Sequence, residues 1–430
     1  VRIIRNFEYL TNSEDKYTVE DIVNEVDAEI ISKNMIDGTP YLKYSVKTDF
    51  PTSFLEISFA NEPADKIAKI LFPVIFGFNA ALFVIYGLVY SDWLAAFNIL
   101  AAGLVISCPV ITLTATNNAL CDASKVLEKR GAMICGYEGA HYIHNSNAIV
   151  MEASELFGPR ACSFHGYKTF NGAKIDDALL ETAAVIIQTN SPLAGVFDSV
   201  IVGRNSILPT AEGITYEDKM GTSAWIYQRK VLVGNRDLLI HHGVAVPKIE
   251  YERKYTRKGR KALYLAVAGK IAAMFIVSYT ADPALKKSLK RLEKSGMTVI
   301  LRSCDPYINE ESVTKLFELP EGFIRVMNAS NGRSFEKYSN AVAEKSPAYA
   351  VHNGTTNAFI STILGADKLV MTEKIISALA SFGSAIGFGV TALLAFANGL
   401  GQLNAVNIVL FQALWSVFVL IITKLRKNGI

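Results

Sequence analysis

Four long apolar segments constrain the fold of this chain more than any other feature. They lie at about 67–90, 93–116, 375–397 and 402–423, and roughly 20 apolar residues are enough to cross the hydrocarbon core of a bilayer. Short turns after Tyr90 and after Ala397 join them into two hairpins. We therefore expect four transmembrane helices and a lipid bilayer as a partner. The alternative is that one pair forms buried core helices of a soluble domain.

Basic residues at the ends of both hairpins predict an orientation. Lys66 and Lys69 precede the first hairpin, and Lys424 follows the second. The positive-inside rule then places both termini and the long middle region in the cytoplasm, and we expect the plasma membrane as the location. The net charge of +3 is too small to indicate nucleic acid as a partner.

The region between the hairpins, 118–374, alternates predicted strands and helices, as an α/β protein does. Within it, three antiparallel strands and a helix predict a smaller α+β domain inserted into a Rossmann-like domain. The expected order is an N-terminal cytoplasmic segment (1–66), a transmembrane hairpin (67–117), the first part of the Rossmann-like domain (118–162), the inserted domain (163–277), the second part of the Rossmann-like domain (278–374), a second transmembrane hairpin (375–424) and a basic tail (425–430).

A proline interrupts the second apolar segment directly after Cys108. Such a break is common in membrane helices, and the freed carbonyl groups then find other partners. A cysteine thiolate is also a ligand for soft metals, so Cys108 is a candidate ligand for a transported cation. Amide side chains in the same segments are candidate co-ligands or interhelical hydrogen-bond donors. They are Asn79, Asn98, Asn404, Asn407 and Gln412.

The order of these parts resembles the P-type ATPases, most closely the heavy-metal-transporting branch, over about 60–425. Cys108-Pro109-Val110 stands where that branch has its Cys-Pro-x motif, and Lys230–Leu239 is close to a stretch of its nucleotide domain. The resemblance implies a HAD-type phosphorylation domain with an inserted nucleotide-binding domain, ATP and Mg²⁺ as cofactors, and a transition-metal cation as cargo. Residues 1–66 contain no T-G-E loop, so the family's actuator domain is absent, truncated or unrecognisable, and the start at Val1 is compatible with a fragment.

The catalytic motifs depart from the family pattern. The phosphorylated D-K-T-G-T motif corresponds to 152–156, with Glu152 at the acceptor position and Glu155 where a phosphate would need room. A side chain longer by one methylene displaces the acceptor, and Glu155 would repel the phosphate. In the T-G-D loop only Asp305 is retained. Asn353 and Asn357 stand at the Mg²⁺ positions, where amides are poorer ligands than carboxylates.

The nucleotide-binding motifs are altered as well. Ser191-Pro192 replaces the family's His-Pro, and Gly221 is the retained glycine of a G-x-G turn. Gly234-Asn235 is a candidate phosphate contact, although a turn before a helix explains that pair better. Structural explanations are favoured over catalytic ones for Glu152, as a capping or structural acid at a strand end, and for Asp305, as a turn or helix-cap residue. His141 and His144 lack the spacing of a zinc site.

The altered motifs together predict a membrane protein with a pump fold that no longer hydrolyses ATP. Its role would be that of a regulator or scaffold with a protein partner. Two alternatives remain. One is an ATP-driven transition-metal cation transporter with drifted motifs, and the other is a membrane-bound sensor of a nucleotide or another small ligand.

Overall fold

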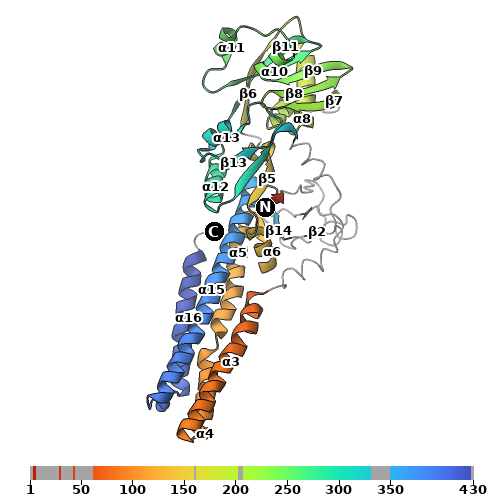
Figure 1. Cartoon of the computed structure of the whole chain (residues 1–430). Coiled ribbons are helices and arrows are strands. Elements are labelled where there is room, and N and C mark those ends of the chain that lie inside the picture. The colour runs from red at the N-terminus through yellow and green to blue at the C-terminus, as the bar shows by residue number, and fades with distance from the viewer. Residues whose placement is uncertain are drawn as a thin grey trace. The chain divides into compact units, whose positions relative to one another are not determined.

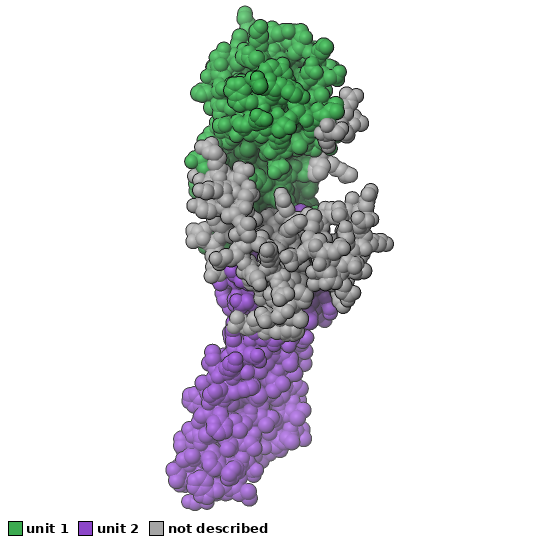
Figure 2. All heavy atoms as spheres, turned by 90° about the vertical axis from the view of Figure 1, so that its right-hand side faces the viewer, with its two compact units in different colours: residues 1–6, 146–343, 355–360 green, residues 7–145, 344–354, 361–430 purple. Residues whose placement is uncertain are grey.

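The computed structural model describes residues 3–5, 29–30, 42–43, 62–158, 161–201, 207–330 and 349–427. The chain divides into two compact units, which Figure 2 colours separately. Unit 1 comprises Val1–Asn6, Ser146–Ala343 and Thr355–Ile360, and unit 2 comprises Phe7–Asn145, Glu344–Gly354 and Ser361–Ile430. Most of the predicted N-terminal segment 1–66 lies outside the described residues.

A four-stranded parallel sheet organises the first part of unit 1 (Figure 1). Its order is β1 (Ile3–Arg5), β5 (Ala148–Glu152), β12 (Thr298–Arg302) and β13 (Ile324–Val326). All three pairings are parallel. The first four residues of β5 are buried, as expected for a strand that is covered on both faces.

Helices connect the strands of this sheet. They are α7 (Ala153–Leu156), α12 (Pro283–Lys294) and α13 (Glu310–Phe317). Helix α12 buries Leu285, Leu289 and Leu292 and exposes most of its lysines. This is the periodicity of a helix that packs one face on a sheet. Asp282 caps its first turn by accepting from the Ala284 N–H.

A six-stranded antiparallel sheet lies between β5 and β12 in the sequence. Its order is β6 (Cys162–Thr169), β11 (Lys270–Tyr279), β10 (Lys261–Val267), β9 (Arg229–Gly234), β8 (Gly221–Ile226) and β7 (Glu212–Glu217). Its helices are α8 (Ile175–Gln188), α9 (Ala194–Ile201), α10 (Arg236–His241) and α11 (Ile249–Tyr255).

Neighbouring residues of β10 and β11 point to opposite faces of this sheet. Both faces are buried. Tyr264 and Met274 belong to the core that includes Leu238 and Leu239 of α10. On the other face, the Phe275 ring lies 5.4 Å from the Phe197 ring of α9. The inserted sheet therefore has its own hydrophobic core.

Unit 2 contains the apolar helices. Their bounds are α3 (Pro63–Tyr90), α4 (Trp93–Ser107), α5 (Val110–Glu128), α15 (Thr356–Phe396) and α16 (Ala405–Lys427), of which α15 begins in unit 1. A two-stranded sheet pairs β4 (Ala132–Ile134) with β14 (Ala350–His352) beside α6 (Gly136–His144). The remaining elements are β2 (Glu29–Ile30), β3 (Leu42–Lys43) and the 3₁₀ helix η2 (Leu400–Gln402).

Within the part of the chain that the structure describes, four helical stretches are long and apolar enough to cross a membrane, with α4 and α5 acting as one broken span. The predicted break at Cys108-Pro109 is confirmed, because α4 ends at Ser107 and α5 begins at Val110. The helix of the third span begins earlier than the predicted 375–397, since α15 is 41 residues long. Its first turns carry polar residues, so the apolar pattern alone could not indicate where the helix starts. The fold class expected from the sequence is confirmed.

Candidate functional site

The first candidate site residue, Glu152, ends strand β5 at the carboxyl edge of the parallel sheet. The register places it directly beside Arg302, the last residue of β12. The Arg302 Nη1 donates to the Glu152 Oε1 at 2.9 Å, and the two side chains are 24% and 29% exposed. A charge-assisted hydrogen bond of this kind holds the carboxylate in one orientation.

Glu152 also caps the short helix α7. Its side chain accepts from the backbone N–H of Glu155. In return, the Glu155 Oε2 accepts from the Glu152 N–H at 2.8 Å, so the two residues form a reciprocal capping box. The Glu155 carboxylate is therefore bound to the backbone of the strand end.

Asp305 lies in the loop after β12 and is almost completely buried, with 1% exposure. Its Oδ2 accepts from the Tyr279 hydroxyl at 2.7 Å and from the Ser191 hydroxyl at 3.3 Å. Its Oδ1 accepts from the Tyr307 N–H at 2.9 Å. Burial raises the pKa of this carboxyl, although the three hydrogen bonds partly offset the shift. Glu152 is not among its partners in the part of the chain that is described.

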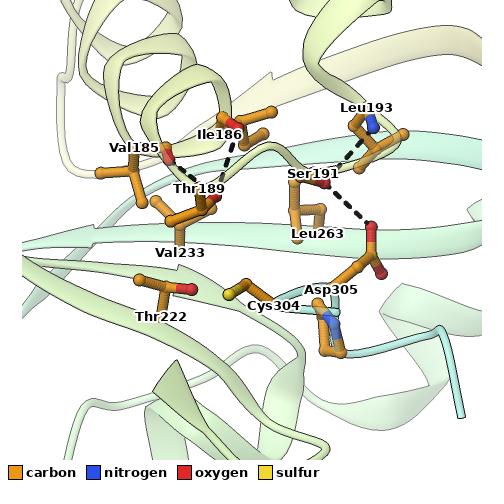
Figure 3. A pocket seen from close by; sticks show the side chains of 11 residues that line it. Val185, Ile186, Thr189, Ser191, Leu193, Thr222, Val233, Leu263, Cys304 and Asp305 are labelled. Atoms are coloured by element: carbon orange, nitrogen blue, oxygen red, sulfur yellow. Dashed lines mark hydrogen bonds between the residues drawn. The ribbon is translucent and has the colours of Figure 1, made fainter. Parts of the chain in front are cut away.

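The nucleotide-site candidates are only partly brought together. Ser191 lines a small pocket beside Thr222, Cys304 and Asp305, and Figure 3 shows its hydroxyl directed at the Asp305 carboxylate. Pro192 follows Ser191 and is buried. Gly221 and Gly234 do not line the pocket but face each other across strands β8 and β9.

Asn235 has a structural role that its sequence context predicts. Its Oδ1 accepts from the N–H groups of Asp237 and Leu238 at 3.0 and 3.1 Å, which caps α10. Its Nδ2 donates to the Lys219 carbonyl at 2.8 Å. The side chain is thus occupied by backbone groups on both sides.

The residues at the expected Mg²⁺ positions do not fit that ion. Asn357 Oδ1 accepts from the Ser288 hydroxyl at 2.9 Å. The Asn353 N–H donates to the Gly131 carbonyl at 2.8 Å. Asn353 belongs to unit 2 and Asn357 to unit 1, and neither supplies the carboxylate that hard divalent cations favour.

The histidines of α6 are bound to carboxylates of α15. His141 Nε2 lies 2.6 Å from Glu373 Oε2, and His144 Nδ1 lies 2.6 Å from Asp367 Oδ1. Among the residues that the structure describes, no group of three or more His, Cys, Asp or Glu could hold a metal ion.

The break at Cys108 is closed by a side chain from α16. The Gln412 Nε2 donates to the carbonyls of Val105 and Ile106 at 2.9 Å each and to that of Cys108 at 3.3 Å. A broken membrane helix must find such partners for its freed carbonyls. Gln412 was one of several candidate amides in the sequence, and only the structure distinguishes it from the others.

The sequence did not single out Arg302, Tyr279 or Tyr307, which hold the two acidic candidates. Arg302 could have been found from the sequence, because it ends the short apolar run Val299–Arg302. This run is typical of a strand that would lie beside the strand of Glu152. The tyrosines hold Asp305 through contacts that no local pattern indicates.

These features define a protein with a parallel α/β sheet, an inserted antiparallel sheet and four apolar helical spans. No family model matches the sequence. A copper-exporting P-type ATPase of Legionella pneumophila subsp. pneumophila is 20% identical over 273 residues, which are 63% of this chain and 37% of that protein. A copper-exporting P-type ATPase of Staphylococcus aureus (strain MRSA252) is 23% identical over 266 residues, 59% of this chain and 31% of that protein.

The sequence matches confirm that this chain resembles heavy-metal P-type ATPases, and the four long apolar helical stretches of the described residues are those of a membrane protein. The chain spans about a third of the length of these curated relatives. Among solved structures, a zinc-transporting PIB-type ATPase in the E2.Pi state matches with 14% identity and a TM-score of 0.43. The match covers 88% of this chain and 68% of the chain of that ATPase.

Proposed function

We propose that this chain is an integral membrane protein of P-type ATPase-like fold that does not transfer the phosphoryl group of ATP. It would act as a regulator or scaffold for a protein partner, in the plasma membrane, with both termini on the cytoplasmic side. The observation that carries the proposal is the state of Glu152, which is bound by Arg302 and by the backbone of α7.

An acceptor carboxylate must approach the γ-phosphorus with an oxygen that other groups leave available. Glu152 instead accepts from the Arg302 guanidinium and from the Glu155 N–H. These two contacts fix the carboxylate at the strand end and reduce its availability as a nucleophile. The Arg302 guanidinium neutralises this acid, so that guanidinium is not available to stabilise a phosphate.

The Mg²⁺ positions support the same proposal. Phosphoryl transfer relies on a metal ion to neutralise the charge that develops on the phosphate oxygens. Asn353 and Asn357 offer only amide groups, and the Asn357 oxygen is already bonded to Ser288. The residue at the acceptor position and the residues at the Mg²⁺ positions therefore both differ from those of a working pump in ways that disfavour phosphoryl transfer.

Labelling with radioactive ATP tests this proposal. The full chain in lipid nanodiscs should form no acid-stable phosphoprotein with ATP and Mg²⁺, in the presence of Cu⁺, Zn²⁺ or neither. The level should equal that of Glu152→Ala, which has no carboxylate at this position. A hydroxylamine-sensitive label that is present in the unmodified chain and lost in Glu152→Ala would overturn the proposal.

A second candidate, an active transition-metal cation transporter, is favoured by one observation. The helix break of the second span carries Cys108, and the matched relatives are named copper-exporting ATPases. This function requires metal-stimulated ATP hydrolysis that disappears in both Glu152→Gln and Cys108→Ser. Equal phosphate release from the unmodified chain and from both variants would exclude it.

A further inference from the structure

The parallel and the six-stranded sheets of unit 1 are linked by the chain at two neighbouring places. One precedes β6 and the other follows β11. The Thr280 N–H donates to the Ala161 carbonyl at 2.7 Å, so the two connections lie side by side. A narrow double connection of this kind is a typical hinge unless further contacts hold the two parts together.

The loop after β12 supplies such contacts. Asp305 accepts from Tyr279 at the end of β11 and from Ser191 after α8. The Tyr307 hydroxyl donates to the Ala262 carbonyl of β10 at 2.6 Å, and the Lys261 Nζ lies 5.5 Å from the Tyr307 ring centre. One loop of the parallel sheet thus contacts three elements of the inserted sheet.

The same loop forms one wall of the pocket in Figure 3. Cys304, Asp305 and Pro306 face residues of α8, β8 and β9, among them Val185, Thr222 and Val233. The Asp305 carboxyl reaches Ser191, the polar group that follows α8 at the rim of this pocket. A ligand that bound Ser191 would have to displace this carboxyl.

We propose that loop 303–308 acts as an intramolecular ligand of the inserted sheet, because it covers one side of the pocket and binds Ser191 in place of an external ligand. Asp305 and Tyr307, which we call the latch, hold the two sheets of unit 1 in one closed arrangement. The latch does not depend on the proposed function, because it would operate whether or not the chain hydrolyses ATP.

The surroundings of Asp305 make the latch sensitive to pH. The titratable groups that face it are Tyr279, Tyr307, Tyr216 and Cys162, and all four are neutral at pH 7. Burial and the nearby Asp305 carboxyl raise the pKa of Cys162 to about 12. Among the described groups, burial has the largest effect on this carboxyl and raises its pKa.

The sign of the pH effect follows from this raised pKa. A carboxyl whose pKa is higher in the folded protein stabilises it fully below the unfolded value of about 4. That contribution is lost as the pH rises through the raised pKa. The latch should therefore be tightest at acid pH and should weaken as the pH rises through the raised pKa of Asp305.

Hydrogen exchange of the full chain in nanodiscs tests the latch. At neutral pH, Asp305→Ala should raise the exchange rates of 186–193 and of 303–308 together by about tenfold, because both ends of the contact lose their partner. Asp305→Asn should leave both segments protected, since its amide can donate to hydroxyls that turn to accept. It should also abolish the pH dependence seen in the unmodified chain. Tyr167→Phe, on exposed β6, serves as the control.

Tyr279→Phe provides a milder variant if Asp305→Ala fails to fold, and it should raise the exchange of both segments several-fold. Faster exchange of 303–308 alone, or of neither segment, would overturn the proposal. So would a rise in protection of the unmodified chain with increasing pH after correction for intrinsic exchange. None of these results depends on phosphorylation, so the latch and the proposed function can fail separately.

Discussion

Replacing Gln412 by leucine is expected to destabilise the helices of unit 2 by about 2 kcal/mol or more. The Gln412 amide donates to the carbonyls of Val105, Ile106 and Cys108 at the break, of which that of Val105 also accepts from the Cys108 N–H at 3.4 Å. Leucine fills a similar volume but donates nothing. No water in the hydrocarbon core would replace the lost hydrogen bonds, so the carbonyls of Ile106 and Cys108 would stay unsatisfied.

Titration with SDS in mixed micelles, followed by tryptophan fluorescence, measures this loss. Ser416→Ala is the matched control on the same helix, since the Ser416 hydroxyl bonds only the Gln412 carbonyl of its own helix and should cost about 0.5 kcal/mol or less. A cost for Gln412→Leu as small as that of the control would show that the contact does not hold the break.

The sequence predicts these helices but not the contact between Gln412 and the helix break, and the difference has a physical reason. The apolar runs and the proline are local properties, so the sequence predicts four spans and the break. The partner of the break is not local, because Gln412 and Val105 are 307 residues apart in the chain. Five amides in the spans were equivalent candidates until packing placed one of them at the break.

In the candidate site, too, the features set by local sequence are predictable and the contacts between distant residues are not. The cap at Asn235 follows from a local pattern of turn and helix, and the structure has it. The pairing of Glu152 with Arg302 depends on the register of two strands that are 150 residues apart. Asp305 was predicted as the one retained acid of its motif, yet its partners are Ser191, which follows α8, and Tyr279, which ends β11 of the six-stranded sheet. The identity of the acids was readable in the sequence, but their hydrogen-bond partners were not.

Substituting alanine for Gly221 is expected to have the largest effect of all. A Cβ at this position would lie 2.4 Å from the Val233 carbonyl oxygen and 2.5 Å from the Gly234 Cα. Its φ of +138° is a conformation that side chains rarely adopt. Overpacking and backbone strain together should cost about 3 kcal/mol or more, which lowers the melting temperature of the inserted sheet by roughly 6–12 °C.

Gly234→Ala should behave similarly, because its Cβ would lie 2.3 Å from the Met220 carbonyl oxygen. Scanning calorimetry of the full chain in detergent measures both variants. Gly195→Ala in α9 is the control, since its Cβ would meet nothing within 4 Å and alanine favours a helix. The two glycines face each other in the register of β8 and β9, so their close approach is needed to form the sheet whether or not a nucleotide binds. If both variants melted like the control and lost only affinity for a nucleotide, Gly221 and Gly234 would be binding residues and this structural explanation would be wrong.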